Sequence, residues 1–296
     1  MRPESERYLA LAGRGRNQWW RYLVGVLVIL LFAEVLGSAP LLLLRHFYDY
    51  SGMRAFFAAN LGVLVELAGV VIAVVLIHRR GLLSLITPHA RVDWLRAAQG
   101  FGVWFVLGAA NCVIESLLYP GRYRLTFDPG TFFQFAVVAL CLTPLQTTTE
   151  ELLFRGYVMQ GLGLLIKRPV IIAIASAAIF MLPHLANPEV ARDPLLVPPQ
   201  YLVIGLLLAA VTLRDGRLEL AIGIHAANNL FIGLVANYDD SVITTDAIFT
   251  AGYDPLYSLV SLVVAATATY AILFGGAMPP REILKADDCG GGQPLK

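Results

Sequence analysis

Eight long blocks of apolar residues occupy most of this chain, and they constrain its fold more than any other feature. The blocks run over residues 22–44, 55–77, 100–119, 131–166, 169–187, 201–213, 218–235 and 256–274. A helix needs about 20 apolar residues to cross a hydrocarbon layer of about 30 Å. The composition, 57% hydrophobic and 15% charged, also differs from that of soluble proteins, which hold about 45–50% apolar and about 25% charged residues. The sequence therefore predicts a polytopic membrane protein.

The apolar blocks are predicted to be helices. In lipid every backbone donor and acceptor must be satisfied within the segment, and the alternating pattern of a transmembrane barrel strand is absent. We expect an all-α bundle of about eight transmembrane helices in one domain, residues 1–296. Within it, residues 1–21 would form a cytoplasmic N-terminal segment and residues 279–296 a disordered cytoplasmic tail.

The lysines and arginines predict the orientation, because basic loops stay on the cytoplasmic side. With both termini inside, sixteen of the 22 basic residues fall on the inner side and Arg155 falls within a span. The outer side holds five, which are Arg45, Arg54, Arg122, Arg124 and Arg192. We therefore expect an integral, multi-pass protein of the cell membrane with cytoplasmic termini and membrane lipid as a partner. The net charge of +1 leaves no basic patch for nucleic acid.

Five glutamates lie inside apolar blocks, where each ionisable residue is a candidate site because burying it in lipid is unfavourable. Glu34, Glu66 and Glu115 are isolated, and we interpret them as core residues that form hydrogen bonds between helices or are protonated. Glu150 and Glu151 differ, since Thr147, Thr148 and Thr149 precede them and Arg155 follows. Such a concentration of polar residues in one span indicates a wet cavity.

The two neighbouring glutamates are predicted to have different tasks. Glu151 and Arg155 are spaced i, i+4, the order that favours a helical ion pair, so we interpret them as a structural brace. Glu150 points about 100° away around the helix and has no partner that we identify in its own segment. It is therefore the carboxylate available for chemistry.

Two of the five histidines, His184 and His225, also lie within spans. An unpaired glutamate and two imidazoles meet the requirements for activating a water molecule. Asn229 follows His225 by four residues, which places a carboxamide donor on the same helix face. In a hairpin that turns at residues 167–168, Glu150 and His184 would lie level, about 25 Å from the turn.

Three motifs then appear in order along the late spans. Glu150-Glu151-Leu152-Leu153-Phe154-Arg155 matches Glu-Glu-x-x-x-Arg, Phe180 to His184 matches Phe-x-x-x-His, and His225 to Asn229 matches His-x-x-x-Asn. Together they resemble the CPBP family of intramembrane proteases, which includes type II CAAX prenyl endopeptidases and the Abi-like bacteriocin self-immunity proteins. The motifs cover about residues 131–238, and the first three helices match in hydropathy alone.

The resemblance implies an intramembrane endopeptidase that hydrolyses a peptide bond in or near the bilayer. Glu150 and His184 would activate the attacking water, His225 and Asn229 would hold the oxyanion, and Glu151 and Arg155 would be structural. The substrate would be a peptide or protein of the CAAX type or a related one, a prenylated tail being the family's best-known target.

The resemblance leaves the cofactor open, because members have been described both as glutamate-type proteases and as metalloproteases. Glu150, His184 and His225 could supply the three protein ligands of an open zinc site, although the zincin motif His-Glu-x-x-His is absent. Two other functions also stay open. One is a catalytically silent membrane protein that binds a peptide or lipid as an immunity or chaperone-like factor, and the other is a small proton-coupled transporter.

Overall fold

A computed structural model of the chain describes residues 2–47, 52–238, 241 and 245–276, and the predicted tail at 279–296 lies outside them. The first half of the chain forms α1 (Pro3–Leu9), η1 (Ala10–Arg14), α2 (Trp19–Leu30), η2 (Leu31–Leu36), α3 (Ala39–Phe47), α4 (Gly52–Val71), η3 (Ile72–Ile77), α5 (Leu83–Ile86), α6 (Trp94–Leu118) and β1 (Tyr123–Leu125). The second half forms α7 (Pro129–Glu151), η4 (Leu152–Val158), α8 (Met159–Leu165), α9 (Pro169–His184), α10 (Pro188–Arg192), α11 (Val197–Asp215), α12 (Glu219–Leu230), η5 (Phe231–Val235), β2 (Ala236–Tyr238), β3 (Phe249–Ala251) and α13 (Pro255–Phe274).

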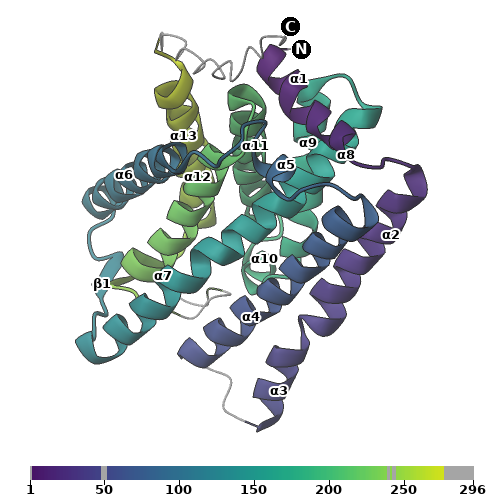
Figure 1. Ribbon diagram of the computed structural model, residues 1–296. Coiled ribbons are helices and arrows are strands. Elements are labelled where there is room, and N and C mark those ends of the chain that lie inside the picture. The colour runs from purple at the N-terminus through teal and green to yellow at the C-terminus, as the bar shows by residue number, and fades with distance from the viewer. Residues whose placement is uncertain (1, 48–51, 239–240, 242–244, 277–296) are drawn as a thin grey trace, which may run out of the picture.

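The predicted all-α membrane bundle is confirmed, and each apolar block coincides with a helical segment (Figure 1). Within the described residues, six helices are long and apolar enough to cross a membrane, namely Trp19–Phe47, Gly52–Ile77, Trp94–Leu118, Pro129–Leu165, Val197–Asp215 and Pro255–Phe274. The long fourth block forms one continuous helical segment of 37 residues, as its length predicted.

The sequence predicted about eight transmembrane helices, and the remaining two apolar helices are shorter than a full span. They are Pro169–His184 and Glu219–Val235. At about 1.5 Å per residue, the 16 residues of α9 measure about 24 Å, less than a hydrocarbon layer of about 30 Å. These two helices carry His184, His225 and Asn229, so three of the four candidate site residues lie on the shorter apolar helices.

One end of the bundle is closed by α1, η1 and α5, and we call this end the α1 face. Tyr8 is fully buried there, and its hydroxyl donates to the carbonyl oxygen of Leu85 at 2.6 Å, with the carbonyl oxygen of Arg155 at 3.2 Å. Burial raises the pKa of the Tyr8 hydroxyl well above its usual value. Arg80 donates to Gln160 at 2.8 Å, which ties the loop after η3 to α8. The bonds of Tyr8 hold the N-terminal helix against α5 and η4.

The opposite end carries three short strands, and we call it the sheet face. β3 lies between the other two strands, antiparallel to β1 and parallel to β2. Arg122 joins the end of α6 to the start of α13 by ion pairs to Glu115 at 2.8 Å and Asp254 at 3.1 Å. The backbone N–H of Tyr257 and the guanidinium of Arg122 lower the pKa of Asp254. Glu115, interpreted from sequence as isolated, is thus a partner in this network.

Small residues let α12 pack closely on α6. A Cβ on Gly223 would meet the carbonyl oxygen of Ala97 at 1.9 Å, and one on Gly100 would meet that of Leu220 at 2.3 Å. Backbones can approach this closely only where side chains are absent, as is common between helices in membranes. The contact fixes the height of α12, and therefore of His225 and Asn229, against α6.

The predicted brace is present at the centre of the bundle. Arg155 donates to Glu151 at 2.8 Å, and both side chains are 0% exposed. The guanidinium also donates to the carbonyl oxygen of Gly205 at 3.2 Å and lies over the ring of Phe180 at 4.3 Å. Arg155 therefore links η4 to α11 and α9 as well as neutralising Glu151.

Replacing Arg155 by alanine should strongly destabilise the protein. The change leaves the Glu151 carboxylate buried without its cation, which typically costs about 3–5 kcal/mol, so the melting temperature of the purified protein should fall. The double variant Arg155→Ala/Glu151→Ala removes both charges and should regain part of that loss. If Glu150→Ala lowers the melting temperature as much as Arg155→Ala does, the Glu151–Arg155 pair has no special role in stability.

Candidate functional site

One cavity of about 420 Å³ brings together the four residues that the motifs singled out. Glu150 reaches it from α7, His184 from α9, and His225 and Asn229 from α12. Residues up to 79 positions apart in the chain thus line the same cavity. The cavity also includes Glu34 and Glu66, so these two acids face it from α2–η2 and α4.

Glu150 has a partner in its own helix, which corrects the prediction that it stands alone there. The side-chain amide of Gln146, one turn earlier, donates to Glu150 Oε1. Glu150 Oε2 lies 3.6 Å from His225 Nε2. Sequence spacing could have revealed Gln146, because it stands at i−4 from the glutamate. The carboxylate is therefore held from two sides, and Gln146 is a site residue that sequence analysis missed.

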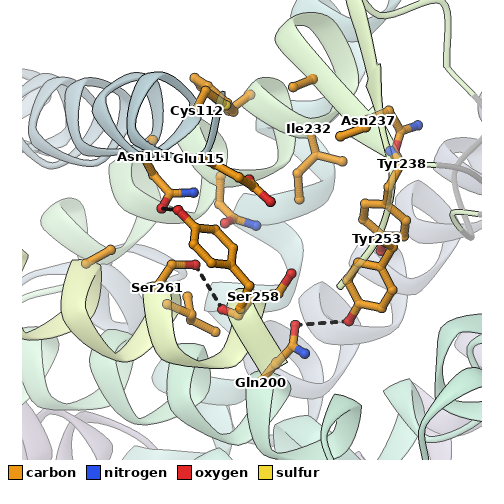
Figure 2. Close-up of a pocket in the computed structure, with 18 of the residues that line it drawn as sticks. Asn111, Cys112, Glu115, Gln200, Ile232, Asn237, Tyr238, Tyr253, Ser258 and Ser261 are labelled. Atoms are coloured by element: carbon orange, nitrogen blue, oxygen red, sulfur yellow. Dashed lines mark hydrogen bonds between the residues drawn. The ribbon is translucent and has the colours of Figure 1, made fainter. Parts of the chain in front are cut away.

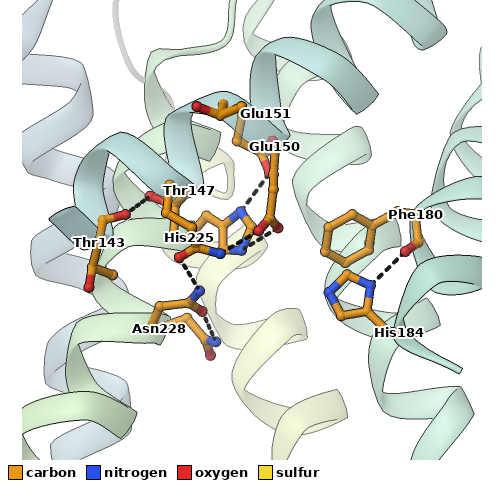
Figure 3. A network of polar contacts seen from close by, with 12 residues as sticks. Thr143, Thr147, Glu150, Glu151, Phe180, His184, His225 and Asn228 are labelled. Atoms are coloured by element: carbon orange, nitrogen blue, oxygen red, sulfur yellow. Dashed lines mark hydrogen bonds and ion pairs between the residues drawn. The ribbon is translucent and has the colours of Figure 1, made fainter. Parts of the chain in front are cut away.

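Glu151 does more than brace Arg155, because the same carboxylate oxygen also contacts His225. The distance from His225 Nδ1 to Glu151 Oε1 is 2.8 Å (Figure 3). A carboxylate oxygen only accepts, so Nδ1 carries the proton and Nε2 is the nitrogen that faces Glu150. The ion pair therefore sets the tautomer and the orientation of the imidazole, a contact between residues 74 positions apart.

His184 lies apart from Glu150 and His225 and approaches them from α9 (Figure 3). Its Nδ1 lies 2.8 Å from the carbonyl oxygen of Phe180, which can only accept, so Nδ1 donates and Nε2 is the basic nitrogen of the neutral ring. The imidazole packs between the rings of Phe180 and Tyr201, with centroid distances of 4.5 and 4.6 Å. Figure 3 shows the other ring nitrogen on the side of Glu150 and His225.

Asn229 belongs to a chain of hydrogen bonds that all run in one direction. Trp104 on α6 donates to Asn228 Oδ1 at 3.2 Å, and the amide of Asn228 donates to Asn229 Oδ1 at 3.0 Å. The amide of Asn229 donates in turn to Gln146 Oε1 at 3.2 Å, and Gln146 donates to Glu150. An indole N–H can only donate and a carboxylate can only accept, so the two ends fix the orientation of all three carboxamides.

The chain of hydrogen bonds gives Asn228 a structural role that the His-x-x-x-Asn motif did not indicate. It also leaves Asn229 with a second amide hydrogen beyond the one that Gln146 accepts. No pattern in the sequence identified Trp104, because it lies 124 positions from Asn228 and on a different helix.

The three residues named as a candidate zinc set are not arranged as one. Among the residues that the structure describes, no three His, Cys, Asp or Glu side chains are grouped so that they could hold a metal ion. Glu150 and His225 adjoin each other, whereas His184 packs against the tilted rings of Phe180 and Tyr201. The side chains as placed therefore do not fit a three-ligand metal site.

The cavity extends to the sheet face. Asn187 and Glu189 line it just beyond α9, and Tyr238 lines it from β2. The hydroxyl of Tyr238 donates to Glu189 at 2.9 Å, and burial raises the pKa of this hydroxyl. The bond ties β2 to α10 beside the cavity.

Comparison with known proteins assigns the same part of the chain to a protein family. The family described as type II CAAX prenyl endopeptidase Rce1-like matches residues 131–231, a stretch that contains all four cavity residues named from the motifs. The uncharacterised protein YyaK of Bacillus subtilis (strain 168) is 30% identical over 244 residues, which cover 77% of this chain and 81% of that protein. No solved structure matches the chain. The protein therefore belongs to the Rce1-like family of type II CAAX prenyl endopeptidases, which are intramembrane proteases.

Proposed function

We propose that this protein is an integral membrane endopeptidase that hydrolyses a peptide bond, in a CAAX-type or related substrate, with a water molecule activated by Glu150 and His184. The observation that carries the proposal is the convergence of Glu150, His184, His225 and Asn229 from three helices on one cavity within the bundle. A basic carboxylate, a basic imidazole nitrogen and two groups able to donate are the parts that water-mediated hydrolysis requires.

The first step needs a base for the water. Glu150 Oε2 and His184 Nε2 are the acceptor atoms that face the cavity from opposite walls, so a water between them would lose its proton to one of them. The remaining hydroxide attacks the carbonyl carbon of the substrate, and the carbonyl oxygen becomes an oxyanion. The proton then passes to the amide nitrogen as the carbon–nitrogen bond breaks, which gives an acid and an amine.

The second requirement is a pair of donors for the oxyanion. His225 and Asn229 lie one turn apart on α12, so they present their polar groups to the same region. The second amide hydrogen of Asn229 can donate directly. Nδ1 of His225 already donates its proton to Glu151, so Nε2 is the nitrogen left for the oxyanion. Nε2 can donate once the ring has taken up a second proton. Donors that are in position before the reaction begins avoid the free-energy cost of reorienting polar groups during the reaction.

Replacing Glu150 by alanine should remove hydrolysis while leaving the protein folded. Membrane-protein termini from cells that contain the wild-type protein should include cleavage products that are absent from cells with Glu150→Ala. The melting temperature of the variant should be equal or higher, because a partly buried carboxylate is lost. Identical termini in the two samples, together with no cleavage of peptides by the purified protein, would favour a silent binding protein.

Asn229→Asp should slow turnover by about 10²–10³ with substrate binding nearly unchanged. The variant keeps the size of the side chain but exchanges a donor amide for a carboxylate, and the lost bond forms mainly in the transition state. The measurement is kcat and KM on a peptide that spans a cleavage site found in the comparison of termini. Full activity of Asn229→Asp would remove this residue from the mechanism.

Trp104→Phe should reduce kcat by about 2- to 10-fold without a comparable change in KM, because it removes one neutral hydrogen bond of about 0.5–1.5 kcal/mol that orients Asn228. Trp104 touches no reacting atom and is a positioning residue. If it acts through Asn228, the double variant Trp104→Phe/Asn228→Ala should be no slower than Asn228→Ala alone. Additive losses would contradict the hydrogen-bonded chain.

A further inference from the structure

A second cavity, of about 300 Å³, lies beside the catalytic cavity (Figure 2). Figure 2 shows it bordered by Ser258 and Ser261 of α13, Asn111 of α6, and Tyr253, which follows β3. Its volume is at the lower end of the range for small-ligand sites, about 300–1,000 Å³. The two cavities share wall residues, which are Glu189, Tyr201, Ile204, Asn228, Ile232 and Tyr238. A ligand in the second cavity would therefore contact side chains that also line the catalytic one.

Tyrosine rings form much of the lining of the second cavity. Each of their hydroxyls has a protein partner among Asn111, Glu115, Asn187, Glu189 and Gln200, and the tyrosines are Tyr123, Tyr201, Tyr238, Tyr253 and Tyr257. Because the hydroxyls are engaged in this way, the tyrosines present mainly their rings to the cavity. Aromatic rings attract one another beyond the burial of their apolar area. An aromatic side chain is therefore a good match for this lining.

The charges of the lining favour an uncharged ligand. Among the described lining residues there are two carboxylates and no lysine or arginine. Glu115 pairs with Arg122 at 2.8 Å, and Glu189 accepts from Tyr238 at 2.9 Å. A ligand carboxylate would meet no cation in the lining, and a ligand cation would meet carboxylates that already have partners. Burying either charge there would be unfavourable.

The chain of hydrogen bonds that ends at Glu150 begins in the second cavity. Trp104 lines this cavity, and Asn228, to which it donates at 3.2 Å, lines both cavities. The later members, Asn229, Gln146 and Glu150, line the catalytic cavity. A side chain packed against Trp104 would restrict the indole and so hold the whole chain in its bonded arrangement.

From this lining and this connection, we propose that the second cavity is a side-chain pocket of the protease. It binds a large uncharged side chain of the substrate, preferably an aromatic one, while the bond to be cut lies in the catalytic cavity. The bound side chain steadies Trp104 and, through Asn228, the orientation of Glu150. The pocket as a binding site stands on its own lining, whereas its role in cleavage rests on the proposed endopeptidase function.

The fluorescence of Trp104 measures binding without any hydrolysis. The full chain has four tryptophans, and Trp19, Trp20 and Trp94 are all exposed. Replacing these three with phenylalanine leaves Trp104 as the reporter. The uncharged probe N-acetylphenylalaninamide should change its emission in a saturable way. N-acetylphenylalanine, which carries a carboxylate, and N-acetylalaninamide, which lacks the ring, should bind at least about 10-fold more weakly.

A matched pair of variants shows whether the probe binds in the pocket. Ser261→Phe places a ring in the cavity and should abolish the fluorescence response. Val264→Phe on the same helix is the control, because Val264 is 62% exposed and lines neither cavity. Ser258→Leu gives the same reading if Ser261→Phe does not fold. A response that survives the filling of the cavity, or no response in the folded reporter protein, overturns the pocket.

Cleavage of peptides tests whether the pocket serves the reaction. When a cleaved peptide is varied one position at a time, one position should favour phenylalanine over glycine by about 10-fold or more in kcat/KM. Ser261→Phe should lose this preference and Val264→Phe should keep it. A preference that Ser261→Phe leaves unchanged overturns the role in cleavage. Probe binding without any Glu150-dependent cleavage would contradict the proposed function and leave the binding pocket standing.

Discussion

A single buried carboxylate, that of Glu151, joins the packing of this protein to its candidate chemistry. One of its oxygens accepts from Arg155 and from His225, each at 2.8 Å, with the carboxylate itself wholly buried. Buried charges are tolerated only when paired and hydrogen-bonded. The requirement to pair Glu151 therefore draws α7 and α12 together and turns the imidazole so that its other nitrogen faces Glu150. Loss of the pair would disturb both the core and the site.

Around this pair the site is built from two kinds of hydrogen bond. On one side a directional chain runs from Trp104 through three carboxamides to Glu150, with donor and acceptor roles set by its ends. On the other side His184 is held by the carbonyl oxygen of Phe180 and by ring packing. The groups on the first side are joined to one another by hydrogen bonds. His184, on the second side, makes its hydrogen bond to the Phe180 carbonyl oxygen instead. Opposed walls that are each held rigidly suit a mechanism in which a water molecule and a peptide bond are placed between them.

Helix length also differs between the elements that carry the site. The helices that carry His184, His225 and Asn229 are shorter than a full span, whereas α7 continues into η4 and α8 as a segment of 37 residues. Three of the four candidate site residues therefore lie on the two shorter apolar helices, beside the longest helical segment of the described chain.

The sequence by itself determined the membrane class, the helical segments and four of the residues that line the cavity. Apolar length and backbone hydrogen bonding in lipid leave few alternatives, and ionisable residues within spans are conspicuous. It also predicted the Glu151–Arg155 pair, because i, i+4 spacing is local. Tertiary structure alone decided that Glu151 orients His225, that Trp104 anchors the carboxamide chain and that His184 stands apart from a metal-binding arrangement. These contacts join residues on different helices, and their geometry depends on helix height and rotation, which Gly223 and Gly100 set through close backbone packing that no local pattern encodes.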